Sequence, residues 1–317
     1  MRSGAALVSR PDAGRLLVTG ADRRAYLQGL LTNDVGALTP NTGCYAAMLN
    51  AQGRMLTDMR VFELGGAMVI ELAASVAASI RDHLDRFVFS EDVQVADITA
   101  TRAQVGVYGP QAAGVVSAVV GSDVSGLPLF GSRESTGAGG PLVIARSDAI
   151  GIAGYELFVD ASEAAAVMDA LRAAGADNAA ADDVEAVRVE SGMPRFGADM
   201  DTDTIPLEAG LDRAISRTKG CYVGQEVIVR VIDRGHGRVA RRLVGLALDP
   251  ASPAPAAGAA IASGDREIGR VTSAVRSPAL HHPIALGYIH RDFTTAGTTV
   301  TIAGSPATVT DLPFVHP

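Results

Sequence analysis

Apolar stretches of strand length and stretches of helical period follow one another along the first hundred positions, and the strands come in pairs. Residues 55–64 and 67–72 have the character of strands on either side of the two-residue turn Gly65-Gly66, which predicts a β-hairpin. Apolar residues recur at helical spacing after Asp22 and after Ser75, and both of these residues are suited to cap a helix. The elements expected here are strands at 16–18, 44–50, 55–64, 67–72 and 93–98, one helix with Tyr26, Leu27, Leu30 and Leu31 on one face, and a second with Ile80, Leu84 and Phe87 on its inner face.

A second, looser copy of this pattern follows between residues 104 and 192. The stretch from Gly131 to Gly140 is rich in glycine and serine and is predicted to be a surface loop. Residues 182–185, Asp-Asp-Val-Glu, have the spacing of a capping box, so a helix is expected to begin there and to stop at Gly192. The other expected elements are strands at 104–108, 142–146 and 155–160, a helix from about Pro110, and a helix from Ser162 to Gly175.

From Arg241 onward the helical period disappears. Short strands separated by glycine and proline predict a small antiparallel β-barrel. Paired strands with one helix suit ferredoxin-like split βαβ modules, with helices on one face of a sheet. We therefore expect an α+β protein with a first α/β module at 1–100, a second at 101–237 and a barrel at 238–317, the two modules being able to exchange segments. The barrel strands are expected at 243–248, 267–275, 284–290, 298–302 and 307–312.

Composition and charge restrict the possible partners. The 317 residues are 48% hydrophobic and 20% charged, as in an ordinary globular protein, and the length suits two or three packed domains. The net charge of −8, from 27 basic and 35 acidic residues, argues against broad binding of nucleic acid. The short basic cluster of Arg238, Arg241 and Arg242 is interpreted as a solvated strand edge.

The two cysteines, Cys44 and Cys221, are too few for a disulfide framework and lack the spacing of a metal site. No apolar run reaches the ~18 residues of a membrane span, and the first twenty residues lack the apolar core of a signal peptide. We therefore expect a monomeric cytoplasmic protein that has no metal and no membrane contact.

The run Lys219-Gly-Cys-Tyr-Val-Gly-Gln-Glu226 holds the more reactive candidate thiol. Lys219 and Arg217 place positive charge near Cys221, which favours a thiolate, and flanking glycines leave the sulfur accessible. The alternative is a tight loop that only places Tyr222 in a core. Cys44, by contrast, begins an apolar strand and is interpreted as core filling.

The segments at 189–197, 205–211 and 219–226 together resemble the YgfZ-type folate-binding proteins. These share a superfamily with the glycine-cleavage T-protein, an aminomethyltransferase that depends on tetrahydrofolate. The resemblance also covers residues 27–35, 49–54, 269–273 and 283–289, and so nearly the whole chain. It implies a three-domain architecture around a central cavity.

What the resemblance implies about function goes beyond the residues themselves. The cofactor would be tetrahydrofolate or a one-carbon derivative, and the partners iron–sulfur client or assembly proteins. The branch is named for assembly or repair of iron–sulfur clusters and, in older usage, for tRNA modification. Cys221 and Lys219 would then belong to a catalytic thiol centre, with Tyr222 against the cofactor.

Asp58 is the first candidate outside that run. It lies in a strand where alternation places Leu56, Asp58 and Arg60 on one face, and an acid in such a strand is costly unless it is paired or faces a polar cavity. Pairing with Arg54 or Arg60 is the alternative to a functional role. The T-protein has two adjacent aspartates here, and this chain has Thr57 in place of the first, which weighs against aminomethyl transfer.

Three further residues are implied as folate contacts. Glu156 follows Gly154-Tyr155 and resembles the glutamate that holds the pterin ring, since a carboxylate accepts two parallel N–H bonds; the alternative is an exposed acid at the start of a strand. Arg188 is expected to pair locally with Glu185 or Asp182, and the resemblance makes it a partner of the folate carboxylate or of Glu156. Glu190 is expected to anchor a loop end and to line the cavity, as is Glu208.

Three functions remain open from the sequence. The first is a tetrahydrofolate-binding protein that supports iron–sulfur proteins through Cys221 as a redox or transfer thiol. The second is a folate-dependent aminomethyl- or methyltransferase that uses Asp58. The third is a docking module without chemistry, in which the cysteine only contacts a partner.

Overall fold

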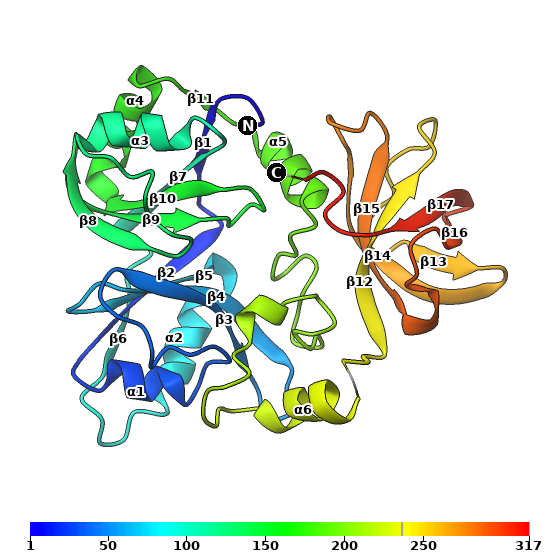
Figure 1. The fold of residues 1–317 in the computed structure, drawn as a ribbon, viewed down its shortest axis with the longest axis horizontal. Coiled ribbons are helices and arrows are strands. Elements are labelled where there is room, and N and C mark those ends of the chain that lie inside the picture. Colours follow the sequence, from blue (N-terminus) through cyan, green and yellow to red (C-terminus); the bar gives the residue numbers. More distant parts are fainter. Residues whose placement is uncertain (236, 317) are drawn as a thin grey trace.

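The computed structural model describes residues 1–235 and 237–316, which form two β-sheets and a closed β-barrel (Figure 1). Helices cover the outer face of each sheet, and the uncovered faces of the two sheets meet. Phe62 and Phe158 mark this contact, with ring centroids 5.8 Å apart. The predicted α+β class is confirmed.

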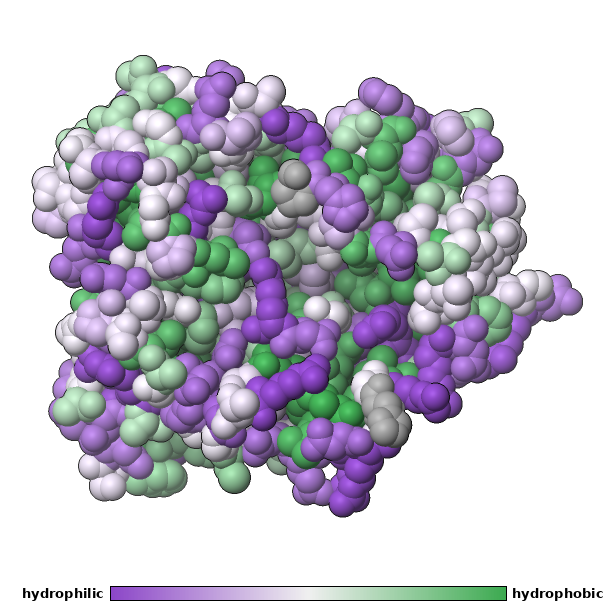
Figure 2. Space-filling view, in the orientation of Figure 1, coloured by the Kyte–Doolittle hydropathy of each residue, from purple (hydrophilic) through white to green (hydrophobic). Residues whose placement is uncertain are grey.

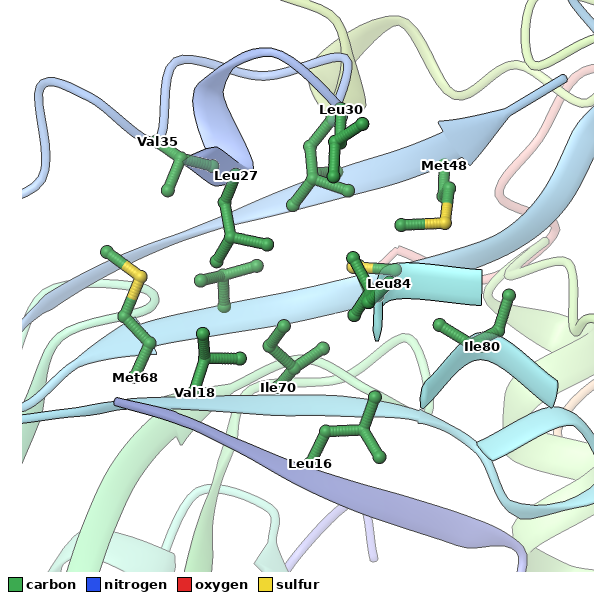
Figure 3. Close-up of a cluster of buried hydrophobic side chains, with 14 of the residues drawn as sticks. Leu16, Val18, Leu27, Leu30, Val35, Met48, Met68, Ile70, Ile80 and Leu84 are labelled. Carbon is green, nitrogen blue, oxygen red and sulfur yellow. The ribbon is translucent and has the colours of Figure 1, made fainter. Parts of the chain in front are cut away.

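The first sheet has five strands in the order β3-β4-β5-β2-β6. Its apolar side chains pack under α1 and α2, and Figure 3 shows Leu27 and Leu84 of these helices reaching down to Val18 and Ile70 of the sheet. The elements are β2 (Ala13–Thr19), α1 (Arg23–Gln28), β3 (Thr42–Leu49), β4 (Met55–Glu63), β5 (Met68–Ala73), the 3₁₀ turn Ala74–Val76, α2 (Ala77–Asp85) and β6 (Gln94–Asp97).

The second sheet has six strands in the order β11-β1-β7-β10-β9-β8. Its first strand in the chain, β1, lies among strands that come about a hundred residues later, so a boundary at residue 100 does not separate the two sheets. The elements are β1 (Ala5–Ser9), β7 (Arg102–Tyr108), α3 (Ala112–Val120), β8 (Ser132–Gly137), β9 (Gly140–Ser147), β10 (Gly154–Asp160), the 3₁₀ turn Ala161–Glu163, α4 (Ala164–Ala173), β11 (Ala176–Asn178) and α5 (Ala181–Glu190).

An irregular segment runs from the end of α5 to the barrel. The barrel closes in the order β12-β15-β14-β13-β16-β17 around its own apolar core, as the sequence predicts, with β13 as an additional strand. No helix in the described ranges has the length and apolar character needed to cross a membrane. The elements are the 3₁₀ turn Asp212–Ala214, α6 (Gln225–Val229), the π-helical turn Arg230–Arg234, β12 (Arg241–Leu248), β13 (Ala260–Ser263), β14 (Arg266–Arg276), β15 (Pro283–His290), the 3₁₀ turn Arg291–Phe293, β16 (Thr299–Ile302) and β17 (Ser305–Thr310).

Several local predictions were wrong. The predicted loop 131–140 contains strand β8, which pairs with β9 at the edge of its sheet and therefore tolerates polar residues. The expected capping box does not form, because α5 begins at Ala181 and its N-cap, Ala180, has no capping side chain. Phe87 is 38% exposed and not on the inner face of α2.

Gly224 fixes how the segment 219–226 sits on the first sheet. Its φ is +80°, and a Cβ there would collide with the carbonyl oxygen of Asn50, in the turn between β3 and β4.

We expect Gly224→Ala to lower the free energy of unfolding by about 1–3 kcal/mol. The alanine would strain the backbone at this positive φ, and its Cβ would also collide with the carbonyl oxygen of Asn50. Gly220→Ala is the matched control, since an added Cβ there meets nothing within 4 Å. Urea unfolding followed by circular dichroism measures both variants. Equal midpoints for the two would contradict this account of the loop.

Candidate functional site

A cavity of about 710 Å³ opens where the two sheets, α5 and residues 194–198 meet. Of the predicted site residues it brings together Asp58 and Arg188, and it adds Arg10, Arg60 and Glu71. Glu156, Glu190, Lys219, Cys221 and Tyr222 are not among the residues that line it. The rest of the lining is largely small or apolar and includes Val8, Leu72, Ala149, Ile150, Val184 and Phe196.

Asp58 lies on β4 with its side chain partly exposed to this cavity. Its Oδ2 accepts a hydrogen bond of 2.7 Å from the hydroxyl of Tyr45 on β3. Burial raises the pKa of Asp58, and the nearby guanidinium of Arg60 only partly opposes this shift. The hydrogen bond from Tyr45 also opposes the shift, because it favours the ionised carboxylate, but burial is the larger effect.

Arg60 and Asp58 share a face of β4 and both line the cavity, as alternation predicts. Leu56 was expected on the same face but packs into the core of the first sheet, with Met59. The cause is a register shift in the pairing of β3 with β4 between Met48 and Leu49, which changes the face of the residues near the start of β4.

Arg10, between β1 and β2, binds carboxylates from both sheets. Its Nη1 donates to Glu156 Oε1 on β10 at 2.6 Å, and its Nη2 lies 3.3 Å from Glu71 Oε1 on β5. Asp12 accepts from its Nε at 3.1 Å. The guanidinium thus joins the two sheets at the inner end of the cavity.

Glu156 is completely buried behind Arg10, so the alternative of an exposed acid at the start of a strand is wrong. The hydroxyl of Tyr108 also donates to its Oε1, and the ring of Tyr108 lies where side chains at Gly106 and Gly154 would collide with it. Burial raises the pKa of Glu156, Arg10 opposes this shift, and the negative charge of Glu71 adds to it.

Arg188 forms the local pair that its spacing predicts. Its Nη2 donates to Glu185 Oε1 at 2.6 Å, and its Nη1 donates to Asp199 Oδ2, also at 2.6 Å. A further bond to Ser273 Oγ at 2.7 Å ties α5 to the barrel strand β14. Its partners therefore do not include Glu156, and most of its donors are already engaged with protein groups.

Neither Glu190 nor Tyr222 lines the cavity. Glu190 accepts from Ser277 Oγ at 2.5 Å and from Arg2, so it joins the end of α5 to the barrel and to the N-terminus and does not line the cavity. Tyr222 packs in the apolar cluster between the first sheet and the barrel, where burial raises its pKa to about 12. Its position fits the alternative reading of the loop.

Lys219 is bound to the main chain near the end of α1, whereas Cys221 is exposed to solvent. The Nζ of Lys219 donates to the main-chain carbonyls of Gln28 and Leu31 at 2.6 Å and of Asn33 at 3.0 Å, at the end of α1. Cys221 is exposed, outside the cavity. Cys44 is half-buried, and burial raises the pKa of its thiol to about 12.

A second cleft, of about 870 Å³, lies between residues 198–208 and the barrel. It is lined by Glu208 and Arg241, whose Nε donates to Glu208 Oε2 at 3.1 Å. The guanidinium of Arg241 also stacks over Tyr288, 4.8 Å from the ring centroid. Arg241 is therefore tied into the junction with the barrel and is not a solvated strand edge.

The inner end of the cavity contains buried polar atoms without partners. Among the described residues that line the cavity, no hydrogen bond reaches Glu71 Oε2 or Arg60 Nε. Leaving such groups unpaired costs about 1–3 kcal/mol each, so they suit a ligand that brings both donors and acceptors. A pterin ring, with an amino–amide edge that donates and ring nitrogens that accept, fits this set.

Sequence reasoning missed Glu71 and Arg10. Glu71 interrupts the apolar run of β5, the same signal that identified Asp58, and could have been found in that way. Arg10 lies between two strands beside Pro11 and carries no such signal, because its importance depends on carboxylates far away in the chain.

Two packed sheets with a cavity of ligand size between them and a C-terminal barrel define the architecture of this α+β protein. The chain matches the GCVT N-terminal domain over residues 1–219 and the glycine cleavage T-protein C-terminal barrel domain over residues 241–316. It therefore belongs to the glycine cleavage T-protein family.

Individual relatives agree with this assignment. The chain is 32% identical over 325 residues to an aminomethyltransferase of Streptomyces coelicolor, covering 99% of this chain and 87% of the relative. It is also 32% identical over 323 residues to one of Synechococcus elongatus, covering 99% and 86%. The crystal structure of glycine cleavage system aminomethyltransferase T from Bartonella henselae has the same fold, with a TM-score of 0.89 at 24% identity over 99% of this chain and 87% of that one.

The pKa shift of Asp58 predicts how stability depends on pH. Because the folded pKa lies above the unfolded value, the native state holds more protons than the unfolded state at pH values between the two, so its stability falls as the pH rises through this window. We expect Asp58→Asn to raise the free energy of unfolding at pH 7 and to lose this advantage once the pH falls below the unfolded pKa.

Asp160→Asn is the contrasting control. Hydrogen bonds from Ser162 lower the pKa of Asp160, so its carboxylate stabilises the fold at neutral pH and that contribution is lost in acid. Urea unfolding of both variants between pH 2 and pH 7 measures the difference. A destabilised Asp58→Asn at pH 7 would contradict the assigned shift.

Proposed function

We propose that this member of the T-protein family binds tetrahydrofolate, or a one-carbon derivative of it, and supports the assembly or repair of iron–sulfur proteins. The observation that carries the folate part is the cavity of about 710 Å³ with the unpartnered carboxylate oxygen Oε2 of Glu71 on its lining. Its volume is in the range of about 300–1,000 Å³ that suits small organic ligands.

Each polar group of the cavity has a definable part in holding such a ligand. Glu71 would accept from the amino–amide edge of the pterin ring, because it lines the cavity and has a free oxygen. Arg10 and Arg60 hold Glu71 in place from two sides, at 3.3 and 3.6 Å. Glu156 lies behind Arg10 and would act through it, by holding the guanidinium in place.

Tetrahydrofolate would supply a carrier for one-carbon units. Asp58 is the group best placed to exchange a proton beside it, since it lines the cavity and burial raises its pKa, while the hydroxyl of Tyr45 holds its Oδ2 in position. Val8, Leu72 and Phe196 would exclude water from the flat ring.

The role in iron–sulfur proteins rests on Cys221 and on the resemblance of its segment. An exposed thiol outside the cavity is accessible to another protein, whereas Cys44 is half-buried in a strand. A single exposed thiol is also too few to hold a cluster permanently, since such clusters generally need several thiolates. The tRNA modification attached to the YgfZ branch would then follow indirectly, through an iron–sulfur enzyme.

Folate affinity tests the cavity directly. We expect Glu71→Gln to weaken binding of tetrahydrofolate about 10- to 100-fold, because one charge-assisted hydrogen bond is worth about 1.5–3 kcal/mol. Glu134→Gln, an exposed acid on β8, is the matched control. Isothermal titration calorimetry under reducing conditions measures both, and an unchanged affinity for Glu71→Gln would remove Glu71 from the site.

Complementation tests the thiol. In a strain that lacks this protein and has lost iron–sulfur enzyme activity, the wild-type gene should restore that activity and Cys221→Ala should not. Cys44→Ala is the matched control and should restore it, because that residue only fills space beside a core. Full rescue by Cys221→Ala would reject the proposed role of the thiol.

A second candidate function is a folate-dependent aminomethyl- or methyltransferase. It is favoured by the position of Asp58 in the cavity and by the aminomethyltransferases among the relatives. Turnover of a one-carbon donor by the purified protein, lost in Asp58→Asn but kept in Cys221→Ala, would select this function over the first.

A further inference from the structure

Positive charge is concentrated in one part of this acidic chain. Residues 213–242 contain eight arginines or lysines and two acidic residues. The remaining residues contain 19 basic and 33 acidic side chains. The segment is therefore an electropositive region on a molecule that is otherwise strongly negative.

Most of this segment lies along one edge of the molecule. It runs from the 3₁₀ turn Asp212–Ala214 through α6 and the π-helical turn to the start of β12, between the first sheet and the barrel (Figure 1). Its inner side is well anchored, because Tyr222 and Ile228 are buried and Val227 packs against Gly53. These contacts hold the backbone of the segment in place, so its outward side chains have a defined position on the surface.

The outward side chains of the segment are mainly cationic. Arg217, Arg230, Arg234 and Arg238 are exposed, and so is Cys221. Arg230 pairs with Glu226 at 2.6 Å, but both side chains are more than half exposed, and such pairs contribute only about 0–1 kcal/mol. Arg234 and Arg238 form no ion pair with any residue that the structure describes.

An apolar side chain lies among these charges. Val229, at the end of α6, is 42% exposed and is one of four large exposed hydrophobic residues in the described chain. Figure 2 shows apolar surface over α6 with strongly hydrophilic residues beside it. Exposed apolar surface bordered by charge is typical of a protein interface.

We infer that the surface formed by Arg217, Cys221, Val229, Arg230 and Arg234 docks an acidic protein segment that also carries apolar side chains. The cations attract and orient the acidic residues, and Val229 gives an apolar contact at the end of α6. A long nucleic acid fits less well, because it would extend onto the acidic remainder of the molecule. The inference extends the proposed function, since Cys221 lies within this surface, but it rests on charge and exposure alone.

Binding of a defined peptide tests the surface. A short fluorescent peptide of glutamate and leucine is titrated with the full-length protein, and anisotropy is read at low and at physiological salt. We expect binding that weakens with salt, and a loss of about tenfold or more in the double variant Arg230→Glu, Arg234→Glu. Val229→Ser should also weaken binding, and so should replacing the leucines of the peptide by serine.

The matched control is Arg266→Glu with Arg291→Glu, two exposed arginines on the barrel that change the net charge equally. This control should bind as the wild type does. Unchanged circular dichroism and folate affinity show that a variant is folded, and they separate failure of this inference from failure of the folate site. The bound peptide should also slow the labelling of Cys221 by a thiol reagent.

Three outcomes would overturn the inference. The first is no peptide binding at low salt, and the second is equal binding by the wild type and the Arg230→Glu, Arg234→Glu variant. The third is tighter binding of poly-uridine than of the peptide, lost in the same variant, which would assign the surface to nucleic acid.

Discussion

The contact of Arg10 with Glu156 and Glu71 holds the centre of this molecule together. Each of these charges is at least 92% buried, and a buried charge costs several kcal/mol unless it is paired. Because Glu156 belongs to one sheet and Glu71 to the other, the pairing works only when the two sheets meet in one register. The cavity opens beside this contact, so its shape depends on the same guanidinium.

The structure separates the cavity from the exposed thiol. The cavity takes its polar groups from the two sheets and from α5, whereas Cys221 lies on an exposed segment anchored by Gly224 and Tyr222. Such a separation suits a protein that holds a small molecule inside and meets another protein at its surface. Within the segment 219–226, Tyr222 is accordingly buried against the core and the neighbouring Cys221 is accessible.

Much of the fold follows from local patterns. The barrel, both hairpins of the first sheet and most helices were predicted, because hydrophobic periodicity and turn residues act over a few positions. The edge strand β8 was missed because one-sided pairing tolerates serine and glycine. Of the residues predicted to contact folate, Asp58 and Arg188 line the cavity, whereas Glu156, Glu190 and Tyr222 do not.

The sequence by itself determined the class of fold, the family and the presence of one acid, Asp58, that a strand would not bury without a reason. Only the tertiary structure decided which charges meet. Arg10 and Glu156 are 146 residues apart, and nothing in the local pattern of either predicts their contact. Strand stacking brings them together, because pairing between distant charges depends on how whole sheets pack, which no short stretch of sequence encodes.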